Sequence, residues 1–157
     1  MISSAAGGIG THLIEYLIKL GYKEIYGIAG SEEKCDFVRK LGAKDCINYK
    51  KHLVGDDYPS FAQKIVQMMG GHADIYFDNI GEEMLTTALL CMKINSKVIL
   101  CGATATYNNW KSKAGILNQE MIISKRIECK GILYYHYSEG KKVMAVMEMI
   151  DLNINGS

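Results

Sequence analysis

Three closely spaced glycines near the amino terminus are the residues whose spacing most clearly predicts a ligand site. Gly7, Gly8 and Gly10 follow a short apolar stretch and precede an amphipathic segment from Thr11 to Leu20. This order is typical of a strand, a glycine turn and a helix. Gly7 and Gly8 allow positive φ and close approach of the backbone, and we expect Gly10 to let the helix pack closely on the sheet. Because the first amides of a helix are free donors, the turn predicts a pyrophosphate site; a tight connection without a ligand is the alternative.

The region about 20 residues after the glycines predicts which dinucleotide is bound. In NAD-specific folds of this kind a carboxylate at that position accepts hydrogen bonds from the adenosine ribose. Here the region is Ala29-Gly30-Ser31, which has no carboxylate. A 2′-phosphate would not be repelled, and Ser31 and Lys34 offer it a hydroxyl and an ammonium group. The sequence therefore favours NADPH over NADH, unless Lys34 is only a solvated residue on an exposed helix face.

Short apolar runs alternate with helical spacing along the whole chain. Runs typical of strands occupy residues 1–3, 24–29, 45–48, 73–78, 97–101 and 127–134. Helical spacing is found at 11–20, 31–41, 60–69, 82–92, 118–125 and 138–152. This alternation predicts an α/β fold, a Rossmann-type doubly wound and mostly parallel six-stranded sheet in the order 3-2-1-4-5-6. The first strand is central in that order but truncated. The polar loop 102–115 lies where such sheets bind ligands.

Composition limits the class of protein. The 157 residues are 48% apolar with a net charge of +1, which predicts one globular domain and argues against nucleic-acid or membrane partners. The five cysteines include no CxxC pair and are typical of reduced thiols, so with no signal peptide or spanning segment we expect a cytoplasmic protein. The four histidines lack a second ligand at useful spacing, so no metal site is predicted.

Several segments, taken together, resemble one family. These are the glycine turn (4–10), Gly-Ile-Ala-Gly-Ser-Glu-Glu-Lys-Cys (27–35), Leu-Gly-Ala (41–43), Ile-Asn-Tyr-Lys (47–50), Asp-Ile-Tyr-Phe-Asp-Asn-Ile-Gly (74–81) and Leu-Cys-Gly-Ala (100–103) with Tyr107-Asn108. They resemble the cofactor domain of the medium-chain dehydrogenase/reductase superfamily, above all the zinc-independent prostaglandin/leukotriene reductases and 2-alkenal reductases. The resemblance implies NADPH-dependent reduction of the C=C bond of α,β-unsaturated ketones or aldehydes, with hydride delivered to the β-carbon.

The resemblance also implies roles for individual residues. The pyrophosphate would lie on the turn, the 2′-phosphate beside Lys34 and Tyr49, and the nicotinamide between the loop after the fifth strand and the sixth strand. The implied cofactor-binding residues are Ala5, Ala6, Gly7, Gly8, Gly30, Ser31, Lys34, Tyr49, Asn79, Cys101, Gly102, Ala103, Tyr107, Leu133 and Tyr134. Tyr107 is the candidate catalytic residue, because its phenol could hydrogen-bond to the nicotinamide ribose or to the enolate oxygen that forms as hydride arrives. The simpler interpretations are a packed strand aromatic for Tyr49, a turn former for Asn79 and a surface residue for Tyr107.

The family pattern includes parts that this sequence does not contain. An amino-terminal substrate domain and a carboxyl-terminal return segment are missing, so residues 1–157 are expected to be the NADP-binding domain of a larger enzyme and inactive by themselves. The apolar segment 132–136 would lie at the sheet edge, which in this superfamily pairs across a two-fold axis. We therefore expect a homodimer through the sixth strand.

Other functions stay open at this point. A quinone reductase of the same superfamily and a non-catalytic NADPH-binding module would both share these motifs. A short-chain dehydrogenase would use the YxxxK spacing of Tyr137 and Lys141 with Ser124 upstream. We regard that spacing as coincidental, because Gly140 is a poor helix former between them and the chain after Lys141 is short.

Overall fold

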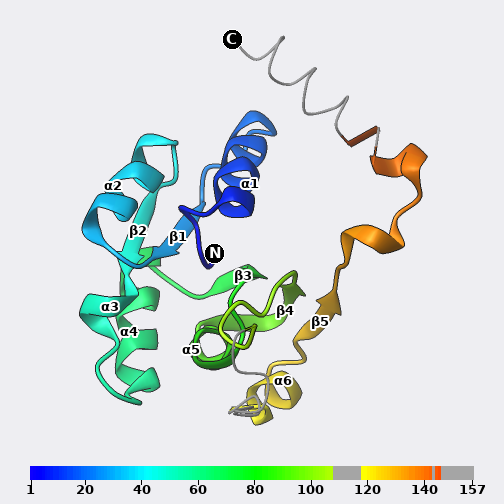
Figure 1. The fold of residues 1–157 in the computed structure, drawn as a ribbon. Helices are drawn as coiled ribbons and strands as arrows, with labels where there is room; N and C mark the ends of the chain where they lie inside the picture. Colours follow the sequence, from blue (N-terminus) through cyan, green and yellow to red (C-terminus); the bar gives the residue numbers. More distant parts are fainter. Residues whose placement is uncertain (108–117, 143, 146–157) are drawn as a thin grey trace.

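The computed structural model describes residues 1–107, 118–142 and 144–145, which form a parallel sheet with helices on both sides (Figure 1). The strands are β1 (Tyr26–Ala29), β2 (Asp45–Asn48), β3 (Ala73–Asp78), β4 (Met92–Leu100) and β5 (Glu128–Gly131). The helices are α1 (Gly8–Lys19), α2 (Glu32–Lys40), α3 (Tyr49–His52), α4 (Tyr58–Met69), α5 (Glu82–Leu90) and α6 (Glu120–Ser124), followed by a 3₁₀ turn, η1 (Tyr134–His136). None of the helices in this described part is long and apolar enough to cross a membrane.

The amino-terminal segment joins the two halves of the sheet. β1 pairs with β2, and β4 lies between β3 and β5, all in parallel. Ile2 forms single parallel bridges to Gly27 on β1 and to Phe77 on β3. The resulting order, β2-β1-Ile2-β3-β4-β5, is the predicted one. The predicted count of six strands is wrong for the described residues: five strands form, because residues 1–3 make only one bridge to each neighbour.

The last part of the sheet also differs from the prediction. The expected strand 127–134 is shortened to β5, and Tyr134–His136 form a 3₁₀ turn (η1) instead of an edge strand. The reason is the length of β4, because Leu100, its last residue, pairs with Gly131 and leaves the following residues without a strand partner. The predicted helix 138–152 begins at residue 139, and from residue 146 onward it lies outside the described residues, as does most of the loop 102–115.

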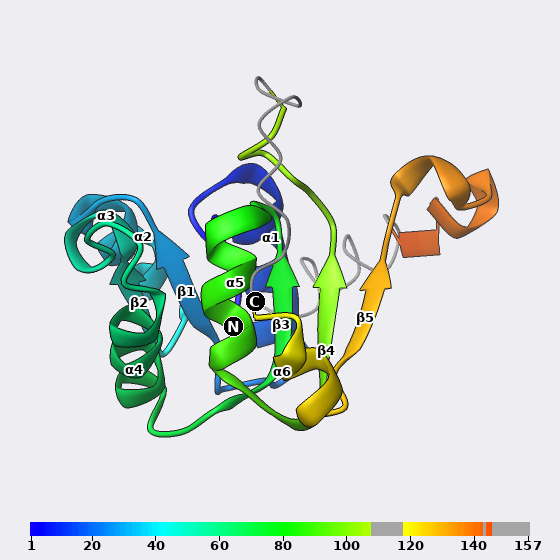
Figure 2. The ribbon, with the colours of Figure 1, turned by 90° about the horizontal axis from the view of Figure 1, so that it is seen from below.

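Two apolar clusters form the core, one on each side of the sheet. Ile14 of α1 and Val38 of α2 pack with Ile2 and the β1–β2 pair on one side. On the other side Phe61 and Ile65 of α4 pack with Leu89 of α5, against residues of β3 and β4. Figure 2 shows α5 running alongside β3, between β1 and β3 in this view, with α6 at the lower end of β4. The carboxyl ends of β1 and β3 therefore meet beside the glycine turn, where a site can form.

Candidate functional site

The positive φ in the glycine turn does not fall on a glycine. Gly7 is the N-cap of α1 with φ −84°, Gly8 is the first helical residue, and neither has a positive φ. The left-handed residue is Ser4, with φ 50°. The positive φ that glycine allows is therefore not used at Gly7 or Gly8. A Cβ on Gly7 would lie 2.9 Å from Ser4 Oγ, whereas one on Gly8 would meet no atom within 4 Å.

Gly10 fulfils the packing role expected of it. A Cβ there would lie 2.5 Å from Ser4 O and 2.7 Å from Ala5 Cα, and both of these atoms belong to the backbone. Because Ala5 N donates to Ile28 O (3.1 Å), this backbone is tied to the sheet and α1 starts directly against it. The amides of Gly8, Ile9 and Gly10 come before the first i→i−4 bond of α1, which Thr11 N donates to Gly7 O. Gly8 and Ile9 are exposed, so their amides are accessible to an anion, whereas Gly10 is buried.

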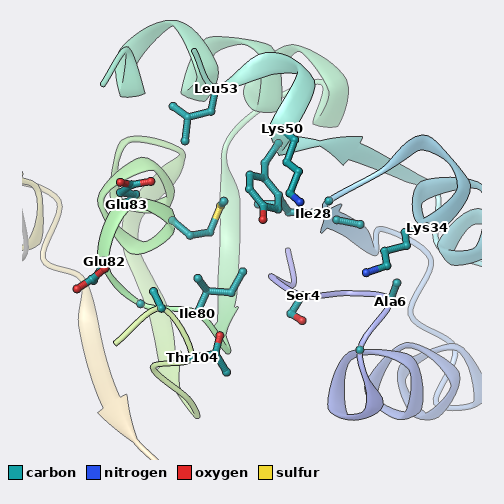
Figure 3. A pocket seen from close by; sticks show the side chains of 17 residues that line it. Ser4, Ala6, Ile28, Lys34, Lys50, Leu53, Ile80, Glu82, Glu83 and Thr104 are labelled. Carbon is teal, nitrogen blue, oxygen red and sulfur yellow. The ribbon is translucent and has the colours of Figure 1, made fainter. Parts of the chain in front are cut away.

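A cavity of about 560 Å³ opens beside this turn, at the carboxyl ends of the strands (Figure 3). Its floor is the turn and the end of β1, with Ser4, Ile28 and Gly30 in its lining. One wall comes from the start of α2 and from α3; the opposite wall comes from residues 80–84 at the start of α5. Thr104 and Ala105, from the loop after β4, close one end. Such a position is the usual ligand crevice of an open α/β sheet.

The charges in the cavity are separated. Lys34 and Lys50 reach into it from one side, and Glu82 and Glu83 lie on the opposite side (Figure 3). Tyr49 packs against the floor, since a Cβ on Gly30 would lie 3.3 Å from its ring. Ser31 caps α2, its Oγ accepting from Lys34 N at 3.2 Å, and does not itself line the cavity. The cavity thus has a cationic side suited to phosphate and an apolar middle formed by Ile28 and Ile80.

A buried polar network positions the loop between β3 and α5. Asp78 Oδ1 accepts from Tyr76 OH (2.8 Å), Ser3 Oγ (3.2 Å) and the amides of Ile80 and Gly81 (both 3.1 Å). Asn79 N donates to Ser3 Oγ at 2.9 Å. Burial and the nearby Asp78 raise the pKa of Tyr76, which keeps this phenol a donor. The network links the amino-terminal segment to the loop that forms one cavity wall.

Two oxygens in this network have no partner within the described structure. They are Asp78 Oδ2 and Asn79 Oδ1, both buried. The backbone carbonyl oxygen of Asn79, by contrast, accepts from Thr104 Oγ1 at 3.1 Å, and a Cβ on Gly102 would lie 2.8 Å from this backbone oxygen. The loop after β4 is therefore held closely against Asn79. An unpaired buried side-chain oxygen is costly unless a further group binds it.

The residues singled out from the sequence fall into three groups. Ala6, Gly7, Gly30, Lys34 and Tyr49 line the cavity. Six others support it or lie beside it: Ala5, Ser31, Asn79, Cys101, Gly102 and Ala103. Four are not brought into it: Gly8 is exposed at the start of α1, Tyr107 is 67% exposed, and Leu133 and Tyr134 are exposed beyond β5. The structure thus brings five of the predicted residues into one cavity, and the assignment of cofactor groups to them stays a prediction.

The sequence reasoning missed several residues that line the cavity. Lys50, Leu53 and the start of α5 (80–84) belong to its walls. Lys50 directly follows Tyr49 and could have been found from that position. Residues 80–84 could have been found because they follow a strand that ends at the ligand edge of the sheet.

The structure does not bring together the three residues that a short-chain dehydrogenase would use. Ser124 ends α6, below the sheet in Figure 2, whereas Tyr137 and Lys141 follow β5 beyond its other end. None of the three lines the cavity. Over the described ranges, no group of three or more His, Cys, Asp or Glu side chains is placed to hold a metal ion. This part of the chain therefore offers no set of zinc ligands.

The fold and the cavity define a Rossmann-type α/β domain. The family model described as zinc-binding dehydrogenase matches residues 8–149. The chain therefore belongs to the zinc-binding dehydrogenase family, and the resemblance stated from the sequence is confirmed.

Curated relatives agree with this assignment. The chain is 35% identical over 138 residues to an uncharacterized membrane protein, YML131W, of Saccharomyces cerevisiae, with 85% of this chain and 35% of the relative covered. It is 31% identical over 137 residues to a 2-alkenal reductase (NADP(+)-dependent) of Nicotiana tabacum, covering 87% and 38%. It is 27% identical over 150 residues to prostaglandin reductase 1 of Bos taurus, covering 96% and 44%. The chain thus spans less than half the length of these relatives.

Solved structures share the fold. CurA from Vibrio vulnificus, in complex with NADPH, aligns with a TM-score of 0.81 at 25% identity, over 99% of this chain and 45% of that one. A quinone oxidoreductase of Escherichia coli complexed with NADPH aligns with a TM-score of 0.78 at 19% identity, over 99% and 44%. The α/β arrangement with parallel strands is therefore confirmed.

Proposed function

We propose that this chain binds NADP(H) in the cavity beside the glycine turn. The observation that carries the proposal is the cationic side of the cavity, formed by Lys34 and Lys50 next to a strand end that carries no carboxylate. An adenosine 2′-phosphate needs such a side, and a ribose hydroxyl alone does not. The NADPH named in the CurA complex and the NADP(+) in the name of the tobacco relative support the same cofactor.

The residues present fit such a cofactor. The glycine turn would bind the pyrophosphate, since Ala6 and Gly7 line the cavity and Gly7 has no side chain to keep that group away. Lys34 and Tyr49 would bind the 2′-phosphate. The apolar surfaces of Ile28 and Ile80 would pack against the adenosine.

We further propose that the chain is the cofactor-binding domain of a reductase of α,β-unsaturated ketones or aldehydes. The relatives named as 2-alkenal reductase and prostaglandin reductase support this choice. The bound cofactor would supply the hydride, which adds to the β-carbon of the substrate. Tyr107 would donate a hydrogen bond to the resulting enolate oxygen, and solvent would then protonate the α-carbon. The substrate itself would be held largely by parts outside this chain, since the chain spans 35–44% of these relatives.

The test is a pair of fluorescence titrations with NADPH and NADH at one salt concentration. We expect a clear preference for NADPH, and Lys34→Ala should weaken NADPH binding about tenfold or more while changing NADH binding little, as expected for one charge-assisted contact. Equal losses for the two nucleotides would remove Lys34 from the 2′-phosphate site. Binding of neither nucleotide by a chain that is folded by circular dichroism would refute the proposal.

Turnover is tested separately, with the complete enzyme. NADPH oxidation should depend on an added enone or enal, and Tyr107→Phe should lower kcat more than it changes the affinity for NADPH. An unchanged kcat would contradict the role of Tyr107. Tight NADPH binding without oxidation in the presence of any enone, enal or quinone would point to a non-catalytic binding module instead.

A further inference from the structure

Lys50 occupies a defined position in the cavity. It lies in α3, whose N-cap is Asn48, and Asn48 Oδ1 accepts from Lys50 N at 3.1 Å. The Lys50 side chain runs along the end of β1, since a Cβ on Gly30 would lie 3.6 Å from Lys50 Cε. Figure 3 shows Lys50 and Lys34 entering the cavity from the side opposite Glu82 and Glu83. The ammonium groups of Lys50 and Lys34, which come from α3 and α2, thus lie in the same cavity.

Neither ammonium group forms an ion pair within the described structure. The ion pairs found there include none to Lys34 or Lys50. The neighbouring Lys51, by contrast, lies 3.7 Å from Glu32 and does not line the cavity. Because like charges in one cavity repel, two unpaired lysines are more stable when an anion lies between them.

The charge of the anion distinguishes the phosphates of a dinucleotide. A phosphomonoester carries about −1.5 to −2 at neutral pH. Each phosphate of a pyrophosphate diester carries one charge, and the glycine turn, whose Ala6 and Gly7 line the cavity, is the proposed site for that group. The charge of two lysines together therefore balances the charge of a phosphomonoester better than the charge of one lysine does.

We propose that Lys50 is a second cation of the phosphomonoester subsite and that it determines selectivity for the 2′-phosphate together with Lys34. The inference rests on the proposed function, because it assigns a residue to the same cofactor cavity. Lys34 binds the phosphate from the start of α2 and Lys50 from α3, so the phosphate is held between two elements that follow β1 and β2.

The experiment compares NADPH and NADH, which differ only in the 2′-phosphate, on the 157-residue chain. Lys50→Ala is expected to weaken NADPH binding about tenfold and NADH binding less than about twofold, as for loss of one charge-assisted contact. Lys50→Arg keeps the charge and should stay within about threefold of the parent for NADPH. Lys51→Ala and Lys64→Ala are matched controls that remove the same charge outside the cavity, and both should leave NADPH binding nearly unchanged.

The outcomes separate the two proposals. A parent chain that prefers NADPH, with Lys50→Ala no weaker than Lys51→Ala, would overturn the role of Lys50 and leave the cofactor proposal standing. Equal losses for NADPH and NADH in Lys50→Ala would also overturn it, because Lys50 would then serve a part common to both nucleotides. A folded parent chain that binds neither nucleotide would refute the cofactor proposal itself.

Discussion

The close start of α1 against the sheet can be tested with one chemical change at two nearby positions. Gly10→Ala and Gly8→Ala each add a single methyl group to the first turn of the same helix. At Gly10 the new carbon would lie 2.5 Å from Ser4 O and 2.7 Å from Ala5 O. At Gly8 it would meet nothing within 4 Å, and Gly8 has no positive φ.

The magnitudes follow from these distances. Ordinary carbon contacts are about 3.5–4.0 Å, so α1 in Gly10→Ala must move by roughly 1 Å away from backbone atoms that cannot rotate aside. Overpacking of this kind costs about 1–3 kcal/mol. Gly8→Ala instead reduces the freedom of the unfolded chain and should gain about 0.4–1 kcal/mol. The free energies of unfolding of the two variants should therefore differ by about 1.4–4 kcal/mol.

Urea denaturation followed by far-ultraviolet circular dichroism measures this difference. With a slope of about 2 kcal/mol per molar urea, the midpoints of the two variants should be about 1 M apart, with Gly10→Ala the lower. NADPH binding should weaken as well in Gly10→Ala, because Ser4 belongs to the cavity floor. Equal midpoints, or a higher midpoint for Gly10→Ala, would refute the claim that glycine is needed there for close packing.

Three further predictions concern the core, the thiols and the assembly. Ser3→Ala leaves the buried backbone amide of Asn79 without its acceptor at 2.9 Å and should lower the free energy of unfolding by about 1–3 kcal/mol in the same urea assay. The control Ser124→Ala, at an exposed position, should change the free energy of unfolding by less than about 0.5 kcal/mol. Burial raises the pKa of Cys91 from 9.0 to about 12, so between these pH values the folded state keeps a proton that the unfolded state releases. The free energy of unfolding should therefore fall between pH 9 and 12, and Cys91→Ala should make that fall less steep by about 1.4 kcal/mol per pH unit. An unchanged slope would show that Cys91 ionises equally in both states. The outer edge of β5 has no partner strand in the described structure, so sedimentation equilibrium should detect a dimer that Cys129→Pro weakens, because the alternation set by the bond from Ile132 N to Leu100 O turns the Cys129 N–H to the outer edge; a monomeric parent chain at tens of micromolar would contradict pairing through this edge.

Much of the fold was predictable because it depends on local pattern. The spacing of apolar residues predicted α1, α2, α4 and α5, and short β-rich runs predicted β1, β2 and β3 within two residues. The predicted start of β4 at residue 97 is wrong, because the strand begins at Met92, where helix spacing was expected to continue. The parallel order followed from the alternation of strand and helix. The ends of β5 and the form of the first strand were not predictable in this way, because strand length depends on how far the neighbouring strand extends. Leu100 ends β4, and the pairing of β5 ends with it.

The sequence by itself determined the class of site, through the three glycines, the absence of a carboxylate at residues 29–31 and the order of the family motifs. Only the tertiary structure decided that Lys50 shares a cavity with Lys34, that Glu82 and Glu83 face them, and that the positive φ falls on Ser4. It also placed Tyr107, Leu133 and Tyr134 outside this cavity. The physical reason is that a local pattern records which elements form, whereas a binding site depends on which loops meet at the edge of the sheet. That meeting is set by packing between residues far apart in the chain, such as Ser3 with Asp78 and Gly10 with Ser4 and Ala5.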